Sequence, residues 1–515
     1  MSQISDRNKR IARNTVMLYL RMFLMMAIGL FTSRITLQAL GVSNYGINNV
    51  VGGIVAMFSL VTGALVNSVS RFLTFELGKK EKNELNKVFC TSINVMALLS
   101  LVVLLLGETV GLWFLYNKLN IPPDRLDAAN VVLQCSIATC ILSLLYLPYN
   151  ALIIAYEKMS IWAYFSIIDA VLKLLVVYAL YISPFDKLKT YALLGLCCIV
   201  IMQIIYRIYC HRTFSVARYH FVLDKPLLRQ IFGFAGWNFM GQGAYVINNE
   251  GVNIVINLFF GVTVNAARGI AVSVNTYVTQ FANNFMVALN PQITKTFAAK
   301  EYEETHKLIF RGAKFAFFLM FLLMLPICLE TRTILHLWLG NVPKYAVEFV
   351  RWTLIITIVN SLSNTLITGL HASGKLRRYM IIVGMVEISN FPLTYLAFKI
   401  GLGPEAAYWV FASIYLILMF LRLYLIKDLI FLNSKDYIRA VYIKVFPVSI
   451  LASVVPLGLC CILEESILRF IIVSFACFCS SSLCIYYLGL EKHEREIIKK
   501  AILSKLLPKI VRHNE

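Results

Sequence analysis

The chain has 515 residues, of which 59% are hydrophobic and 15% are charged, and its mean hydropathy is +0.73. A soluble domain carries about 25% charged residues, so this composition excludes a soluble protein and indicates apolar surface that faces lipid. The net charge of +21 suggests nucleic-acid binding, but the basic residues stand in short blocks between apolar segments, where they set membrane orientation. We therefore predict no nucleic-acid partner.

Apolar segments long enough for membrane-spanning helices, which need ~20 residues, recur along the whole chain. The first follows Arg7, Lys9, Arg10 and Arg13 and is too long for a signal peptide, so we expect it to be retained. The predicted fold class is an all-α membrane protein with about fourteen transmembrane helices. The predicted spans are 14–40, 44–77, 85–116, 127–157, 160–182, 190–210, 231–260, 264–294, 306–329, 346–371, 378–400, 404–426, 440–463 and 467–490.

The basic residues are distributed unequally between the two sides of these spans. The loops on one side carry 34 Lys and Arg residues, those on the other side carry 9, and the remaining five lie inside spans. Positively charged loops stay in the cytoplasm, so both termini are predicted to be cytoplasmic. This orientation requires an even number of spans, which fourteen satisfies.

A weak repeat at an offset of 220 residues relates the two halves of the chain. Gly41-Val42-Ser43 matches Gly261-Val262-Thr263, and Lys80-Glu81 matches Lys300-Glu301. The offset equals six spans, and parallel repeats of this kind are typical of transporters, with the substrate site between them. The predicted domains are a first lobe of helices 1–6, a second lobe of helices 7–12, helices 13 and 14, and a basic amphipathic cytoplasmic tail; their ranges are 1–221, 222–430, 431–490 and 491–515.

Polar residues form stripes on three predicted helices, within arcs of ~80–120° at 100° per residue. Continuous stripes favour a water-filled cavity, although Asn, Ser and Thr also join packed helices by hydrogen bonds. Helix 8 carries Arg268, Asn275, Thr279 and Asn283; helix 7 carries Asn238, Gln242 and Asn249; helix 2 carries Asn48. We predict that these eight residues bind substrate.

Charged residues inside spans are costly and therefore often functional. Arg34 and Arg71 join the predicted substrate-binding residues, although Arg34 and Arg268 could equally reach the lipid headgroups. Glu250 and Glu387 are the candidate sites for a coupling proton or cation. Asp169 and Lys173, four residues apart, are expected to pair with each other.

Motifs for cofactors, nucleotides or metals are absent from the sequence. The twelve cysteines fall in apolar spans without metal-ligand spacing, and no phosphate-binding loop or nucleophile motif occurs. We predict no cofactor, no metal and no enzymatic activity, so that energy would come from an ion gradient (H⁺ or Na⁺), from a substrate gradient or from downstream consumption of the product.

The chain resembles the polysaccharide-transporter (Wzx-type) flippases, which share a superfamily with the MATE multidrug exporters and the peptidoglycan-lipid flippases. The resemblance rests on the Arg-rich start, on Leu40 to Gly46, on Asn265 to Ala271 and on the layout of six plus six plus two helices. It implies two lobes in a MATE-like arrangement, working by alternating access in a bacterial inner membrane. The implied substrate is an undecaprenyl-pyrophosphate-linked oligosaccharide for O-antigen, capsule or exopolysaccharide, and the implied partners are membrane lipids and other polysaccharide-assembly proteins.

Other functions are weighed against this one. An ion-coupled drug or metabolite exporter of the same superfamily would have twelve spans and a cavity rich in carboxylates and aromatics, and a peptidoglycan-lipid flippase would share the fold. A membrane-embedded glycosyltransferase or polymerase would carry a large hydrophilic loop, which the sequence lacks.

The orientation can be tested by cysteine labelling. We expect Asn117→Cys to react with a membrane-impermeant thiol reagent in spheroplasts and Lys80→Cys to react only after lysis, with the unsubstituted protein as the background. The reverse pattern would overturn the orientation.

Overall fold

The computed structural model describes residues 2–56, 73, 82–156, 158–222, 224–491 and 494–496. All the regular elements in these residues are helices, which confirms the predicted all-α class. Nine helices of this described part are long and apolar enough to cross a membrane, and a bent pair would make a tenth. The helices α8 (Lys225–Phe260) and α9 (Val262–Ala298), which carry polar stripes, are not among the nine, so the number fourteen is approximate.

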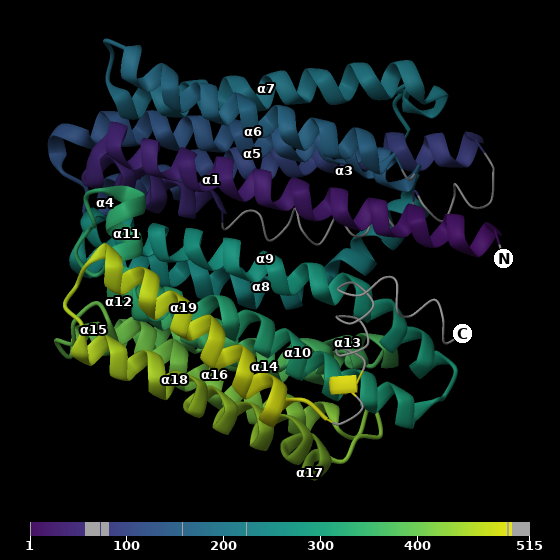
Figure 1. Ribbon diagram of the computed structural model, residues 1–515. Coiled ribbons are helices and arrows are strands. Elements are labelled where there is room, and N and C mark those ends of the chain that lie inside the picture. The colour runs from purple at the N-terminus through teal and green to yellow at the C-terminus, as the bar shows by residue number, and fades with distance from the viewer. Residues whose placement is uncertain are drawn as a thin grey trace. The chain divides into compact units, whose positions relative to one another are not determined.

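The elements are shown in Figure 1. In chain order they are α1 (Ser2–Ala56), α3 (Lys82–Leu106), η1 (Gly107–Gly111), α4 (Leu112–Asn117), η2 (Pro123–Arg125), α5 (Leu126–Ala155), α6 (Met159–Ile182), α7 (Lys187–Thr213), η3 (Ser215–Ala217), α8 (Lys225–Phe260), α9 (Val262–Ala298), α10 (Tyr302–Leu329), α11 (Thr331–Leu339), α12 (Ala346–Ser361), α13 (Asn364–Ser373), α14 (Arg377–Ile388), α15 (Asn390–Lys399), α16 (Ala406–Ile426), α17 (Ser434–Tyr437), η4 (Ile438–Tyr442), α18 (Ile443–Ile462), α19 (Ile467–Cys484) and η5 (Ile485–Gly489).

A predicted span and a predicted loop differ from the observed helices. The predicted span 346–371 is broken between α12 and α13, which are bent by 41° relative to each other. The turn lies at Leu362 and Ser363, where the backbone N–H of Ser363 donates to the Asn360 carbonyl. The nine-residue helix α11 falls in a predicted loop, because it is too short to carry a spanning pattern.

The repeat is visible in the helix boundaries. Gly41, which kinks α1, and Gly261, which separates α8 from α9, both have φ = 76°, a left-handed conformation that glycine adopts readily. The starts of α3 and α10, at Lys82 and Tyr302, are also 220 positions apart, as are those of α5 and α12 at Leu126 and Ala346. The offset therefore relates helices that share almost no identical residues.

The helices pack into two compact units, of which the first comprises residues 1–270, 338–346 and 380–410, and the second comprises 271–337, 347–379 and 411–515. The boundary between them falls inside α9. The predicted lobe boundaries at 221 and 430 follow the repeat rather than this packing and stay a prediction, and most of the predicted tail lies outside the described residues.

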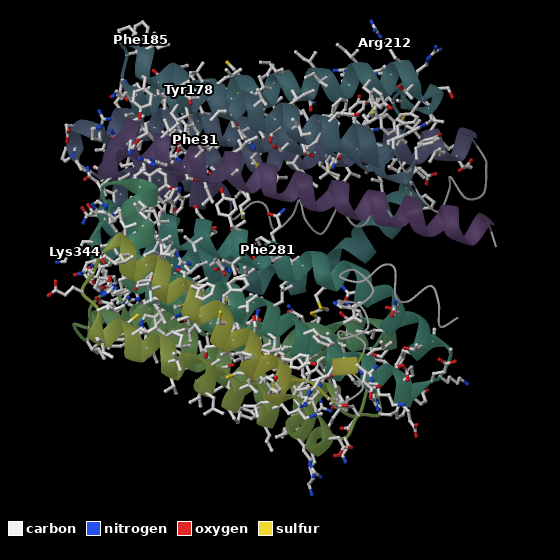
Figure 2. The ribbon with its side chains drawn as sticks, in the orientation of Figure 1. Phe31, Tyr178, Phe185, Arg212, Phe281 and Lys344 are labelled. Carbon is white, nitrogen blue, oxygen red and sulfur yellow. The ribbon has the colours of Figure 1, made fainter. Side chains whose placement is uncertain are left out.

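Within unit 1, α1, α5, α6 and α7 pack side by side (Figure 1). Phe31 of α1 and Tyr178 of α6 lie with their ring centroids 6.3 Å apart (Figure 2). At the start of α7, the Asp186 carboxylate accepts hydrogen bonds from the backbone N–H groups of Leu188 and Lys189. The same carboxylate forms an ion pair with Arg125 at 2.7 Å. Burial raises the pKa of Asp186, but the N–H donors and the guanidinium outweigh it, so its pKa lies below the ordinary value.

Within unit 2, ion pairs join the middle and the C-terminal end of α10 to α19 and to the segment that follows it. The side chain of Glu330, just after α10, is fully buried and lies 2.9 Å from Arg469 Nε of α19. Near the middle of α10, Lys314 Nζ lies 3.3 Å from Glu494 Oε2, and both side chains are buried. These pairs attach α19, which lies beyond the predicted repeat, and the segment after it to α10.

Breaking the Glu330–Arg469 pair should destabilise unit 2, because the largely buried Arg469 guanidinium would keep, among the described carboxylates, only the more distant one of Glu465, at 3.8 Å. We expect Glu330→Leu to cost about 3–5 kcal/mol and to lower the apparent melting temperature of the detergent-purified protein. The neighbouring exposed pair of Arg332 and Glu465 is the control, and Arg332→Leu should change stability by less than ~1 kcal/mol. Equal effects of the two substitutions would contradict this assignment.

Candidate functional site

A cavity of about 690 Å³ lies among α1, α5, α6 and α7 of unit 1. Hydroxyl, amide and phenol groups stand in its wall beside aliphatic side chains; they belong to Thr32, Asn48, Ser136, Thr139, Ser143, Tyr146, Asn150 and Tyr191. Its charged lining residue is Lys173. The wall therefore offers many neutral hydrogen-bonding groups and one cation to a ligand.

The polar lining from α5 forms a stripe that the sequence analysis missed. Ser136, Thr139, Ser143, Tyr146 and Asn150 fall within an arc of ~80° at 100° per residue. The same angular test that identified the stripes on helices 2, 7 and 8 would have found this one, because its spacing is equally regular.

Lys173 in the cavity wall belongs to an intramembrane ion pair. Its Nζ lies 2.7 Å from Asp169 Oδ2, which confirms the predicted pairing. The Asp169 carboxylate also acts electrostatically on Tyr146 and Cys198, which line the cavity. The cation that faces the cavity is therefore balanced by a carboxylate of the same helix.

The second half of α1 separates this cavity from a buried polar network. Asn48 and Gly52 line the cavity, so Asn48 does face a cavity within unit 1. On an adjacent face, the Asn49 carbonyl accepts a hydrogen bond from Asn253 Nδ2 at 3.4 Å. A Cβ at Gly53 would stand 2.7 Å from Glu250 Oε2, so this glycine permits close approach of α1 to α8.

The network links α1, α8, α9 and α15 through buried asparagines. Asn265 Nδ2 donates to the Asn253 carbonyl and side-chain oxygens, both at 2.8 Å, and Asn257 Nδ2 donates to Asn265 Oδ1. Asn390 Nδ2 donates to Asn248 Oδ1 at 2.6 Å. These amides pair with one another, as buried polar groups in a membrane must, except that Asn248 Nδ2 has no hydrogen-bond partner among the described residues, and they hold the four helices together.

Arg268 and Glu250 belong to this network. Arg268 is only 5% exposed, and its Nη2 donates to the Asn249 carbonyl at 2.8 Å. Its guanidinium acts electrostatically on the Glu250 carboxylate, which accepts a hydrogen bond from Asn253. Arg268 therefore lies inside the protein instead of reaching the headgroups, and Glu250 has a countercharge that the sequence did not reveal.

The remainder of the α9 stripe lies in unit 2. Asn275 Oδ1 accepts a 2.7 Å hydrogen bond from Thr357 of α12, and Asn290 Oδ1 accepts one of 2.8 Å from Thr368 of α13. Thr279 Oγ1 donates to the Asn275 carbonyl, whereas Asn283 is exposed. The stripe thus serves partly to join helices, and Asn283 is the member most open to a ligand.

The other predicted site residues are dispersed. Arg34 is half-buried in α1, and Glu387 of α14 is 9% exposed. Arg71 and the side chains of Asn238 and Gln242 lie outside the described residues. No group of three His, Cys, Asp or Glu residues suited to a metal ion occurs in the part of the chain that the structure describes.

The MatE family model matches residues 244–396, and no curated protein matches the chain. The solved structures supply the closer comparison. The lipid II flippase MurJ in an inward closed conformation has a TM-score of 0.70 at 14% identity, over 91% of this chain and 98% of its own. The chain has the fold of the MOP superfamily of transporters and flippases. It is a multi-pass membrane protein.

Two further structures cover less of the chain. An inward-facing MATE multidrug transporter has a TM-score of 0.62 at 13% identity, over 78% of this chain and 95% of its own. A MOP-superfamily transporter from Pyrococcus furiosus, described as having a binding pocket of reversed polarity, has a TM-score of 0.54 at 14% identity, over 80% of this chain and 95% of its own. All three are transporters or flippases, not enzymes.

The electrostatic interaction of Arg268 with Glu250 predicts compensation between substitutions at these two positions. Glu250→Gln should lower the melting temperature, because it removes the countercharge of a buried guanidinium. The double variant Glu250→Gln/Arg268→Gln should recover much of the loss. Thermal unfolding of the two single variants and the double variant measures the coupling, and strictly additive losses would show that the two charges do not interact.

Proposed function

We propose that this protein is a flippase that moves an undecaprenyl-pyrophosphate-linked oligosaccharide from the cytoplasmic to the periplasmic leaflet of a bacterial inner membrane. The observation that carries the proposal is the cavity of unit 1, whose wall presents hydroxyl and amide groups among membrane-spanning helices. Such groups match the hydroxyls of a sugar, which both donate and accept hydrogen bonds. A purely apolar drug would leave them without partners.

The fold supports a flippase over a drug exporter. The lipid II flippase aligns with 91% of the chain, whereas the multidrug transporter aligns with 78%. The larger aligned share of the flippase is consistent with the presence of α18 and α19, two helices beyond the twelve-helix repeat. A peptidoglycan-lipid flippase would share these features, and the substrate's sugar distinguishes the two.

In this proposal the cavity holds sugar while Arg268 meets the pyrophosphate. A guanidinium binds phosphate oxygens bidentately, but Arg268 is now engaged by Asn249 and Glu250. Uptake of H⁺ or Na⁺ by Glu250 would neutralise the carboxylate and weaken its hold on the guanidinium. Arg268 could then exchange Glu250 for the substrate's phosphate, which would couple ion binding to transport.

Filling the cavity tests the sugar site. A side chain at Gly195, which lines the cavity, would meet no atom within 4 Å of its Cβ, so Gly195→Leu should fold normally and reduce transport strongly. Gly458 of α18 also has open space around it but lies in unit 2, so Gly458→Leu is the matched control. Both are assayed by complementation of a flippase-deficient strain at equal protein levels; unimpaired Gly195→Leu would refute the cavity assignment.

Arg268 gives a separate test of the lipid-phosphate interaction. Arg268→Ala should abolish movement of lipid-linked oligosaccharide in reconstituted vesicles, and Arg268→Lys should restore it only partly, since an ammonium lacks the bidentate fork. Glu250→Gln should insert normally but lose the response to an imposed ion gradient. Transport of a cationic drug instead of the lipid-linked sugar by the unsubstituted protein would favour the exporter function.

A further inference from the structure

An apolar groove of about 410 Å³ runs between α10 and α19 in unit 2. Phe315, Leu319 and Leu322 of α10 form one wall, and Ile485, Tyr486 and Leu490 form the other. The two walls approach closely at Gly489, where an added Cβ would stand 2.8 Å from the Phe318 ring. The groove is therefore a built feature of two helices that ion pairs hold together on either side of it.

The groove suits hydrocarbon rather than water. A water occupies ~30 Å³ in the liquid, and apolar cavities stay dry unless polar groups can hold it. From Phe315 to Leu322 the groove follows α10 for roughly 10 Å, at 1.5 Å per residue. Because both helices are long and apolar enough to span a membrane, a lipid chain is the hydrocarbon available to it.

A group of charged residues stands at one end of the groove. Four cations, Arg311, Lys314, Lys444 and Arg495, accompany two carboxylates, Glu491 and Glu494. Lys314 and Arg311 contact Glu494, and Lys444 lies 2.8 Å from Glu491. The group therefore has a surplus of two positive charges, and it stands on the side of the groove nearer to the start of α10, which the charge bias predicts to be cytoplasmic.

Arg495 brings this charge to the mouth of the groove. Its Nε donates to the Leu490 carbonyl at 3.1 Å and its Nη2 to the Tyr487 carbonyl at 2.6 Å. Leu490 itself lines the groove. Among the residues that the structure describes, Arg495 forms no ion pair with a carboxylate, and the adjacent Glu496 is exposed and also forms none. A guanidinium held only by carbonyls keeps its charge available for an anion.

We propose that this groove binds one anionic phospholipid of the cytoplasmic leaflet, with an acyl chain along α10 and the phosphate at Arg495. The apolar walls recognise the chain, and the surplus positive charge selects an anionic headgroup over a zwitterionic one. The site is separate from the cavity of unit 1 and does not depend on the proposed flippase activity. The bound lipid chain would fill the groove between α10 and α19.

Native mass spectrometry of the full-length protein tests the site, after extraction from membranes of phosphatidylglycerol and phosphatidylethanolamine. We expect one retained phosphatidylglycerol, and Arg495→Ala should lower its retention by about fivefold, since one basic residue contributes ~1 kcal/mol to binding an anionic lipid surface. Arg495→Lys should keep most of the binding. Leu319→Trp, which narrows the groove without changing charge, should also reduce retention.

Matched variants elsewhere control for general effects. Arg212, exposed at the end of α7 (Figure 2), and Leu193, 51% exposed on α7, should give wild-type retention as Arg212→Ala and Leu193→Trp. Equal retention of phosphatidylethanolamine, a retained species with the mass of a polyprenyl phosphate, or unchanged retention in both groove variants would each overturn the proposal. If Arg495→Ala folds poorly, Leu319→Trp decides the question alone.

Discussion

A polar group inside a bilayer has no water to bond with, so it must find its partner within the protein. This constraint organises unit 1 around the asparagines of α8 and α9. Asn253, Asn257 and Asn265 form hydrogen bonds to one another and to the backbone of α1. These bonds hold the helices together, because apolar side chains alone would pack equally well against protein or lipid. By the same constraint, polar groups that line a cavity among spanning helices indicate a ligand that bonds to them.

The cavity of unit 1 is the exception to this mutual satisfaction. Its hydroxyl and amide groups line open space among spanning helices, and Lys173, which is paired with Asp169, stands in its wall. The second half of α1 carries Asn48 on the cavity side and Asn49 on the network side. A ligand that displaces this segment would therefore act on the Glu250–Arg268 network, which gives substrate and ion a shared helix through which to influence each other.

Ion pairs take a different place in unit 2. One stands just after α10, where Glu330 meets Arg469, and the other stands near the middle of α10, where Lys314 meets Glu494. They attach α19 and the segment that follows it to α10. The groove between α10 and α19 lies between these two fixed points. The surplus of positive charge lies at the end of the groove where the anionic leaflet is expected, so the groove is suited to an anionic lipid.

The sequence by itself determined the class and most helix positions, because apolar length is a local property that a bilayer enforces directly. It also revealed the 220-residue repeat, which the shared conformation of Gly41 and Gly261 and the helix starts at Lys82 and Tyr302 support. Only the tertiary structure decided which polar residues are satisfied. Glu250 and Arg268 are eighteen positions apart in sequence, and Asn275 and Thr357 lie on different helices, so helical periodicity could show that each faces inward but not what it meets. Likewise, only the packed helices show that the α5 stripe lines a cavity and that the chain bends between α12 and α13.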